Sequence, residues 1–274
     1  MAQPPILVLG ASSLVGRFAL PRLQAAGLAF NAVSRHPEPG WIQADIETAE
    51  GRAALPPATT VLSFSPIWLL PDLIPTLKAG GMDRLIAFSS TSVLTKAGSA
   101  NPAERAVVSA LEAGEAAVRD SGAGWTILRP TLIYAEGRDG NVSRLASLAR
   151  RFGVLPIAGS GAGLRQPVHG DDLAAAALSA LDAPPSVGRT YELAGGETLS
   201  YRQMCEHVFE GLERRPRILS LPAPLWRLGL MLASPLLPGA NAQMGERMDR
   251  DLTFGDAAAR ADLGWSPRPF RPRF

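Results

Sequence analysis

Short apolar runs alternate with longer segments of helical periodicity over the first two thirds of the chain. The runs Ile6–Leu9 and Leu85–Phe88 are continuously apolar, which is typical of strands buried on both faces of a parallel sheet. The pattern predicts strands near 5–10, 28–34, 41–44, 59–64, 84–89 and 125–129, and helices near 14–26, 68–79 and 103–121. This repeated strand–helix order predicts an α/β fold built on a doubly wound parallel sheet.

The pattern is less regular in the last third of the chain. Residues 159–163 read as a glycine-rich loop, and Asp171 and Asp172 precede an alanine-rich helix at 173–181. Because aspartate is a favoured N-cap residue, we expect one of the two to cap that helix. A further strand is predicted at 191–194, and a helix that opens with Ser200 is predicted over 198–213.

The most informative pattern is the turn that follows the first predicted strand. Gly10 ends the apolar run, small residues follow, and Gly16 begins the helical segment. Glycine lets the chain reverse sharply and lets the helix pack close to the sheet, while free N–H groups at the start of the helix can hold a pyrophosphate. We therefore expect a Rossmann-type dinucleotide-binding domain at 1–155. A strand near 185–195 returns to it, and 156–274 form a small C-terminal α/β lobe that binds or covers the substrate.

Six landmarks occur in a fixed order along the chain. They are Gly10–Gly16, Ser34-Arg35, Ala44-Asp45-Ile46, Phe88–Val93, Leu128–Tyr134 and Gln166–Leu173. In this combination the sequence resembles the extended short-chain dehydrogenases/reductases, also called the NAD-dependent epimerase/dehydratase family. The resemblance covers nearly the whole chain and implies an NAD(P)(H) cofactor and a small-molecule substrate.

The resemblance also implies roles for individual residues. The pyrophosphate would lie on the turn Gly10, Ser12, Ser13, Leu14, Val15 and Gly16. Asp45 and Ile46 would bind the adenine. The ribose and nicotinamide would contact Ser63, Phe64, Ser65, Ser89, Pro130, Thr131, Leu132 and Ile133. Ser13 stands where the family usually has glycine, so its side chain limits how close a phosphate can come to the backbone.

The end of the second strand bears on the choice of dinucleotide. An acidic residue there accepts a hydrogen bond from a ribose 2′-OH, whereas an arginine pairs with a 2′-phosphate. This chain has Ser34 and Arg35, and no acid until Glu38. The pattern favours NADP(H) over NAD(H). The alternative is that Arg35 is an ordinary surface charge.

The family's catalytic pair is a tyrosine four residues before a lysine. None of the 3 tyrosines here has a lysine at that spacing, and Val107 and Leu111 stand at the two matching positions. Neither side chain can transfer a proton. Ser90 matches the family's substrate-orienting hydroxyl and is the remaining catalytic candidate, although it could instead cap the strand end or contact the cofactor.

Four further residues are substrate-binding candidates from the resemblance: Thr91, Ser92, Arg165 and His169. His169 lies in a landmark that positions the following helix, which favours a structural role. Arg129 precedes Pro130 and is expected to anchor the end of its strand by hydrogen bonds.

Composition narrows the remaining possibilities. The chain has 274 residues, a net charge of +2 and 1 cysteine, so it can bury a full core but cannot form an intrachain disulfide. The near-neutral charge gives no reason to expect a nucleic-acid partner, and no His/Cys cluster has the spacing of a metal site. Without a recognisable targeting signal, we expect a cytoplasmic protein, monomeric or homodimeric. The apolar segment 222–238 is too short to span a bilayer and reads as a lid or core segment, or less readily as a membrane-surface helix.

These observations lead to a main hypothesis and two alternatives. The main hypothesis is an atypical NADPH-dependent reductase acting on a small carbonyl, enone or quinone-like substrate. The first alternative is a non-catalytic dinucleotide-binding regulator or an accessory protein of a respiratory complex. A nucleotide-sugar epimerase or dehydratase is the weakest, because that chemistry depends on the missing tyrosine.

Overall fold

The computed structural model describes the whole chain except residues 1–3, 223, 227–244 and 246. The chain divides into two compact units, each assembled from three segments. Unit 1 comprises Met1–Thr131, Gly170–Leu193 and Gly255–Ser266. Unit 2 comprises Leu132–His169, Ala194–Phe254 and Pro267–Phe274.

A seven-stranded sheet forms the centre of unit 1, in the order β11-β6-β5-β4-β1-β2-β3. All six pairings in it are parallel. The strands are β1 (Ile6–Leu9), β2 (Phe30–Ser34), β3 (Ile42–Gln43), β4 (Thr60–Ser63), β5 (Arg84–Phe88), β6 (Gly124–Pro130) and β11 (Arg189–Leu193). The predicted doubly wound α/β sheet is confirmed, and its first six strands lie where the apolar runs predicted them.

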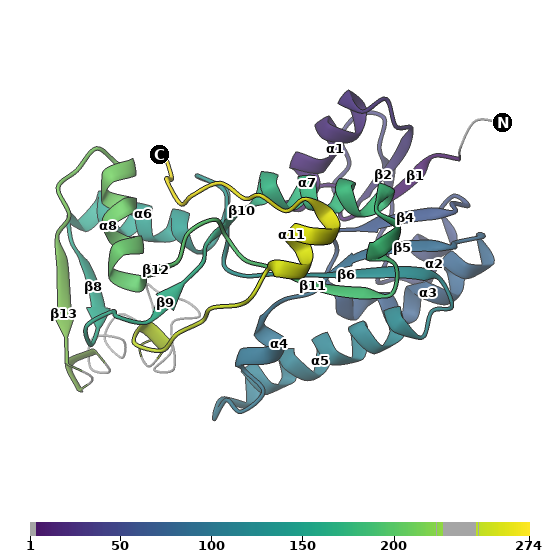
Figure 1. Cartoon of the computed structure of the whole chain (residues 1–274). Coiled ribbons are helices and arrows are strands. Elements are labelled where there is room, and N and C mark those ends of the chain that lie inside the picture. Colours follow the sequence, from purple (N-terminus) through teal and green to yellow (C-terminus); the bar gives the residue numbers. More distant parts are fainter. Residues whose placement is uncertain (1–3, 223, 227–244, 246) are drawn as a thin grey trace. The chain divides into compact units, whose positions relative to one another are not determined.

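Helices cover both faces of this sheet (Figure 1). The helices α1 (Gly16–Ala25) and α7 (Gly170–Asp182) lie on one face, and α3 (Leu70–Ala79) and α5 (Pro102–Arg119) lie on the other. Apolar strand residues such as Leu9 and Val61 pack with Leu73 of α3 and Leu111 of α5 in one buried cluster. The shorter helical elements of the unit are α2 (Ala49–Ala53), η1 (Ile67–Leu69), α4 (Ser92–Thr95), η2 (Pro184–Ser186) and α11 (Ala257–Leu263).

The start of α7 differs from the sequence prediction. The helix begins at Gly170, so Asp171 and Asp172 lie within its first turn rather than before it. Asp171 instead accepts a hydrogen bond from Arg22 of α1, with 2.7 Å between Oδ1 and Nε. Carboxylates in a first turn still favour the helix because they face the positive end of its dipole. Here one of them also holds two neighbouring helices together.

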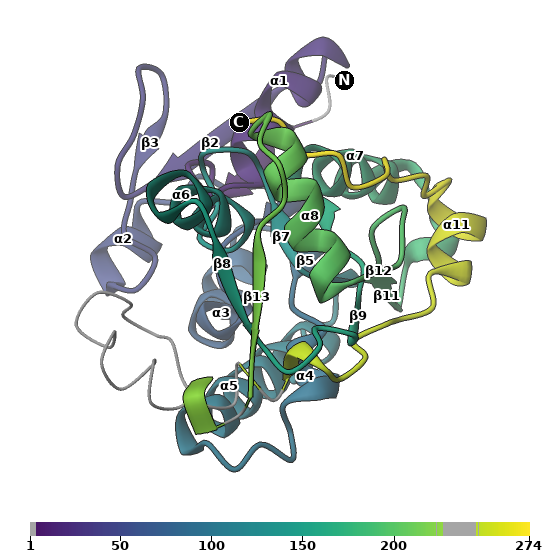
Figure 2. The same cartoon turned by 90° about the vertical axis from the view of Figure 1, so that its left-hand side faces the viewer.

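Three short strand pairs and two helices make up most of the regular structure described in unit 2. The pairs are β7 (Ile133–Tyr134) with β10 (Val168–His169), β8 (Leu155–Ala158) with β13 (Ile218–Leu221), and β9 (Leu164–Arg165) with β12 (Leu199–Ser200). The helices are α6 (Val142–Phe152) and α8 (Tyr201–Gly211). β8 and β13 run side by side next to both helices (Figure 2). Ser200 is the N-cap of α8 and forms a capping box with Gln203, as its position at the start of the predicted helix required.

The two units differ from the predicted ranges 1–155 and 156–274. Residues 132–155 belong to unit 2, and α7 and 255–266 belong to unit 1. The strand predicted near 185–195 does return to unit 1, as β11. The physical reason lies in the returning elements, because α7 packs on α1 and β11 pairs with β6. Most of the apolar segment 222–238 lies outside the described residues.

Candidate functional site

The turn between β1 and α1 has no room for side chains at its two glycines. Gly10 has a φ of +68°, and a Cβ built on it would lie 2.7 Å from the backbone nitrogen of Ser65. A Cβ on Gly16 would lie 2.5 Å from the carbonyl oxygen of Gly10. Glycine at position 10 therefore lets the turn close against the residues that follow β4, at the carboxyl edge of the sheet where doubly wound folds bind their ligands. Glycine at position 16 lets α1 begin close to the turn itself.

Ser13 stabilises this turn from inside. Its Oγ accepts a hydrogen bond from the backbone N–H of Gly16 at 3.1 Å, and its own backbone N–H donates to Gly10 at 2.9 Å. A hydroxyl that accepts in this way keeps its O–H for a further acceptor. The side chain expected to limit phosphate binding is thus one that can also donate to a phosphate oxygen.

The end of β2 is joined to the turn by serine hydroxyls and surrounded by ion pairs. The Oγ atoms of Ser12 and Ser34 are 2.7 Å apart. Arg35 pairs with Glu47 at 3.2 Å, and Arg17 pairs with Glu38 at 2.8 Å. All four charged side chains are exposed. The two arginines beside the β2 end therefore already have carboxylate partners.

The adenine-binding candidates lie in the turn after β3. Ile46 is buried in the core cluster of unit 1. Asp45 is held by this turn, since its Oδ1 accepts from the N–H of Glu47 at 3.1 Å and its carbonyl oxygen accepts from Thr48. The position of Asp45 is thus determined by local hydrogen bonds.

The surroundings of Ser63 show whether the carboxyl edge of the sheet fits a polar ligand. Ser63 is the last residue of β4, lies opposite Leu9 of β1, and is 1% exposed. Among the residues that the structure describes, its Oγ has no hydrogen-bond partner. A buried hydroxyl without a partner is costly, and this one lies where β4 and β1 end beside the glycine turn. The residues present fit a dinucleotide there.

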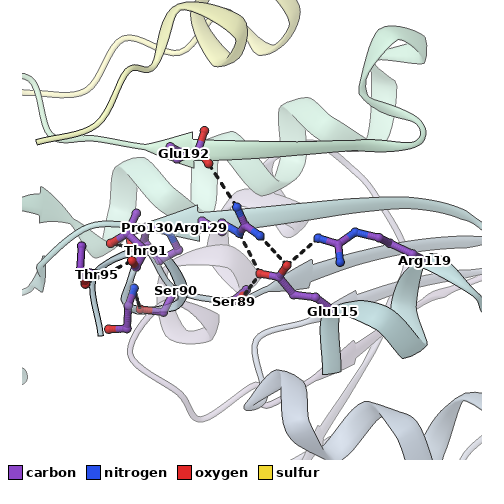
Figure 3. A network of polar contacts seen from close by, with 10 residues as sticks. Ser89, Ser90, Thr91, Thr95, Glu115, Arg119, Arg129, Pro130 and Glu192 are labelled. Carbon is purple, nitrogen blue, oxygen red and sulfur yellow. Dashed lines mark hydrogen bonds and ion pairs between the residues drawn. The ribbon is translucent and has the colours of Figure 1, made fainter. Parts of the chain in front are cut away.

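A buried carboxylate organises the neighbouring strand ends (Figure 3). Glu115 of α5 is 1% exposed. Arg129 of β6 binds it through two bonds, Nε to Oε1 at 2.8 Å and Nη2 to Oε2 at 2.6 Å. Ser89 donates to Oε1 at 2.7 Å and Arg119 to Oε2 at 2.6 Å. Arg129 also reaches Glu192 of β11 at 3.3 Å, which connects α5 with the ends of three adjacent strands.

The charge of Glu115 is stabilised by these donors. Burial by itself would raise the pKa of Glu115, but hydrogen bonds from Arg129 and Ser89, together with the Arg129 charge, lower that pKa below its ordinary value. As predicted, Arg129 anchors the end of its strand by hydrogen bonds, here to Glu115. Sequence reasoning did not include Glu115 among the site residues, although the spacing of Glu115 and Arg119 on one helix was a usable signal.

The hydroxyl residues after β5 follow Ser89 directly. Thr91 donates to the carbonyl oxygen of Pro130 at 3.1 Å, and the Oγ of Ser90 accepts from the N–H of Ser92 at 3.1 Å. These bonds leave the O–H of Ser90 available to donate. On α5, Val107 is 43% exposed and Leu111 is 3% exposed. Neither side chain has a group that can transfer a proton.

Four candidates named from the sequence belong to unit 2: Leu132, Ile133, Arg165 and His169. The Arg165 guanidinium is buried and donates to the backbone carbonyl groups of Leu164, Arg247 and Arg250. His169 lies 3.1 Å from Glu136, measured from Nε2 to Oε2, and its ring meets that of Tyr134 edge-on. The contacts of Arg165 hold a distant segment of the chain against β9.

In the described ranges, no group of three or more His, Cys, Asp or Glu side chains has a metal-binding arrangement. No described helix combines the length and apolarity needed to cross a bilayer.

Comparisons with curated proteins identify relatives. The sequence is 30% identical to the (4-alkanoyl-5-oxo-2,5-dihydrofuran-3-yl)methyl phosphate reductase of Streptomyces griseus, over 97% of this chain and 95% of that protein. It is 29% identical to the y4nG protein of Sinorhizobium fredii and 35% identical to NADH dehydrogenase [ubiquinone] 1 alpha subcomplex subunit 9 of Arabidopsis thaliana. The matches span 50% of y4nG and 25% of that subunit. No family model matches the sequence.

Solved structures share the fold at low sequence identity. MoeE5 in complex with UDP-glucose and NAD has a TM-score of 0.74 at 19% identity, with 97% of this chain and 94% of that chain covered. A short-chain dehydrogenase/reductase superfamily protein of Agrobacterium tumefaciens with bound NAD has a TM-score of 0.73 at 15% identity, with 98% and 94% covered.

The sheet order and the glycine turn define a Rossmann-fold protein. With a full-length relative at 30% identity and these structural neighbours, the chain belongs to the extended short-chain dehydrogenase/reductase family, also called the NAD-dependent epimerase/dehydratase family.

Proposed function

We propose that this protein is an NADPH-dependent reductase of α,β-unsaturated carbonyl compounds that works without the tyrosine–lysine pair. The observation that carries the proposal is the glycine turn packed against β4, with the unpartnered Ser63 hydroxyl beside it. A buried donor at the carboxyl edge of a doubly wound sheet is where a dinucleotide is expected to bind. The Streptomyces relative is named as a reductase of a dihydrofuranone, which contains such a conjugated carbonyl group.

The cofactor would be held by the residues named from the sequence. The turn from Gly10 to Gly16 would bind the pyrophosphate through backbone N–H groups, with the Ser13 hydroxyl donating to a phosphate oxygen. Asp45 would accept from the adenine, and Ser63 would donate to a ribose hydroxyl. Arg35 would pair with a 2′-phosphate, which has to compete with Glu47 for the same guanidinium. When bound, the reduced dinucleotide supplies a hydride.

Conjugate reduction removes the need for a strong acid at the carbonyl oxygen. Negative charge develops on that oxygen when the β carbon is reduced, and hydrogen-bond donors stabilise it. Ser90 supplies one such donor, because its Oγ accepts from Ser92 and its O–H is available. The α carbon is then protonated by water. Glu115 and Arg129 act as positioning residues that fix Ser89, the residue before Ser90.

The test has two stages. Titration with NADPH and NADH, followed by energy transfer from tryptophan to the nicotinamide, measures binding. Oxidation of NADPH with a panel of butenolides, enones, quinones and aldehydes then measures turnover. We expect NADPH binding and turnover of enones or butenolides, reduced at least about tenfold in Ser90→Ala. Failure of both nucleotides to bind would refute the proposal.

The second candidate function is a non-catalytic dinucleotide-binding accessory protein. It is favoured by the absence of a tyrosine–lysine pair and by the matches to NADH dehydrogenase subunits, of which only a part is covered. Tight nucleotide binding with no oxidation of NADPH by any substrate in the panel would favour this candidate over the reductase.

A further inference from the structure

The surface of unit 2 where α6 ends beside β13 is rich in arginine and poor in acids. The sequence has no aspartate or glutamate from 140 to 170 or from 214 to 226. Two short exposed stretches within these ranges, 151–152 and 214–219, supply the side chains of interest. We call them the α6–β13 surface, and its members are Arg151, Phe152, Arg214, Arg215, Arg217 and Leu219.

Hydrogen bonds hold the two stretches side by side. The Arg214 guanidinium donates to the carbonyl oxygens of Ala149 and Arg150 in the last turn of α6, at 3.3 and 2.9 Å. The N–H of Leu155 donates to the carbonyl oxygen of Arg217 at 2.9 Å, where β8 and β13 begin to pair (Figure 2). The arginines before β13 are therefore neighbours of the end of α6.

Two large apolar side chains are exposed among these arginines. Phe152 is the last residue of α6 and is 58% exposed, and the Arg151 guanidinium lies 5.2 Å from the centre of its ring. Leu219 of β13 is half-exposed. Since Ile218 packs in the core of unit 2 and neighbours in a strand point to opposite faces, Leu219 and Arg217 share the outward face.

The acids near this surface do not cancel its positive charge. No ion pair between described residues includes any of its four arginines. Glu210, in the last turn of α8, contacts His207 of the same helix at 2.7 Å, and Glu213 just after the helix is exposed. Arg202 and Glu206 of α8 add one charge of each sign. Even with Glu210 and Glu213 counted at full charge, four positive charges stand against two negative ones.

We propose that the α6–β13 surface binds the headgroup region of an anionic lipid bilayer. Each arginine near such a bilayer is attracted by its negative surface potential, so the guanidinium groups need not converge on one ligand atom. Exposed Phe152 and Leu219 can enter the boundary between headgroups and acyl chains. A nucleic-acid backbone would attract the same arginines, but it has no apolar region for a leucine to enter. The proposal does not depend on nucleotide binding in unit 1.

Sedimentation with lipid vesicles tests this surface. Vesicles of phosphatidylcholine with about 30% phosphatidylglycerol should bind the protein, and vesicles of phosphatidylcholine alone should bind it at least about tenfold more weakly. Raising the salt concentration from about 0.1 to about 0.5 M should weaken binding to the anionic vesicles at least about threefold, because salt screens exposed charges.

A matched pair of double variants locates the contact. Arg151→Ala/Phe152→Ser should bind the anionic vesicles at least about tenfold more weakly than the wild type, because it removes one charge and one inserted ring. Val187→Ser/Arg189→Ala is the control, since Val187 is 50% exposed and stands near an exposed arginine in unit 1. The control should bind within about twofold of the wild type, as should Arg151→Lys, which keeps the charge. Thermal unfolding should show the same Tm for every variant, because all the changed side chains are exposed.

Several results would overturn the proposal. They are no binding to the anionic vesicles, equal binding to phosphatidylcholine alone, and equal losses in the two double variants. Tighter binding to a DNA duplex than to the vesicles, with no change in Phe152→Ser, would assign the surface to nucleic acid instead. Because none of these measurements uses NADPH, their failure and a failure of the proposed function are told apart.

Discussion

Glu115 joins α5 to β6 and to the residue that follows β5 through side-chain hydrogen bonds. Its two oxygens receive four hydrogen bonds, two of them from Arg129. Breaking a buried ion pair by removing one charge leaves the other without compensation. In the sequence Glu115 looks like any other glutamate of a helix, but in the structure it holds α5 to neighbouring strand ends of unit 1.

We predict that Glu115→Gln destabilises the protein by about 3 to 5 kcal/mol, because Arg129 then loses its two short bonds to a carboxylate and keeps only the 3.3 Å ion pair with Glu192. Urea denaturation of the variant and the wild type measures the difference. Glu112→Gln is the control, since Glu112 is exposed on the same helix, and it should change stability by less than about 0.5 kcal/mol. Equal losses in both variants would contradict the buried-pair explanation.

The pH dependence of this difference follows from the lowered pKa of Glu115. A carboxyl whose pKa is lower in the folded state stabilises the fold fully above its unfolded value of about 4.3, and loses that contribution as the pH falls through the folded value. We expect the stability gap between the wild type and Glu115→Gln to be constant above about pH 5 and to narrow below about pH 4. A gap that is independent of pH down to acid unfolding would contradict this.

Arg35 and Glu47 make a paired prediction about the cofactor. Arg35→Ala should weaken NADPH binding about tenfold and leave NADH binding unchanged, since only the former carries a 2′-phosphate. Glu47→Gln should strengthen NADPH binding, because it removes the carboxylate that now holds Arg35. Fluorescence titrations of both variants with both nucleotides measure the two ratios. An unchanged preference in Arg35→Ala would mean that Arg35 is an ordinary surface charge.

At the scale of elements, the β1–α1 turn depends on close packing rather than on backbone freedom alone. Gly10 and Gly27 have nearly the same φ, +68° and +67°, but a Cβ meets the backbone at 2.7 Å only at Gly10. Gly27→Ala should therefore cost only the left-handed conformation, about 1 to 2 kcal/mol. Gly10→Ala should cost clearly more and abolish nucleotide binding. Thermal unfolding and titration of both variants with NADPH measure this, and equal destabilisation would contradict the packing argument.

The elements that could be predicted from the sequence are those with a clear local signal. Strands such as β1 and β5, buried on both faces, appear as unbroken apolar runs, and the capping box at Ser200 indicates where α8 begins. β8 and β13 were not predicted. β8 is short and contains Pro156, and β13 is partly exposed, so neither has the apolar pattern of a strand, and only their pairing with each other identifies them. α6 was missed although its signal was present, since Asp139 precedes an apolar series from Val142 to Ala149 at helical spacing.

For the candidate site, what the sequence could indicate depended on how far apart the residues lie in the chain. The residues of the glycine turn follow each other in the chain, so a motif is enough to find them. The partners of Glu115 come from β6, from α5 and from the residue that follows β5, and Arg129 of β6 also pairs with Glu192 of β11. Contacts between such distant segments depend on tertiary packing, and no local pattern encodes them.

At the scale of the whole molecule, the chain passes between the two units after residues 131, 169, 193, 254 and 266. Because of these repeated crossings, we expect the units to unfold together rather than as separate domains. Cys205 of α8 can report this. It is fully buried in unit 2, and burial raises the pKa of its thiol to about 12, so a thiol reagent reacts only after opening.

We predict that NADPH, through the site proposed in unit 1, slows the labelling of Cys205. At 100 times its Kd, a ligand that binds only the folded state lowers the unfolded population about 100-fold. The rate at which Cys205 reacts with a chromogenic disulfide measures this effect. Glutathione in a separate sample of the same buffer is the control for the chemistry of the reagent. A labelling rate that does not change with NADPH would mean that unit 2 opens by itself.

The pairing of β6 with β11 has a consequence for biosynthesis. During translation, β6 leaves the ribosome well before Arg189 to Leu193 of β11 have been made. At typical synthesis rates this interval lasts about 3 to 12 seconds, during which one edge of a growing apolar sheet has no neighbour. A nascent chain in that state can pair with a wrong strand, so we expect chaperones that hold exposed edges to raise the yield of the protein in cells.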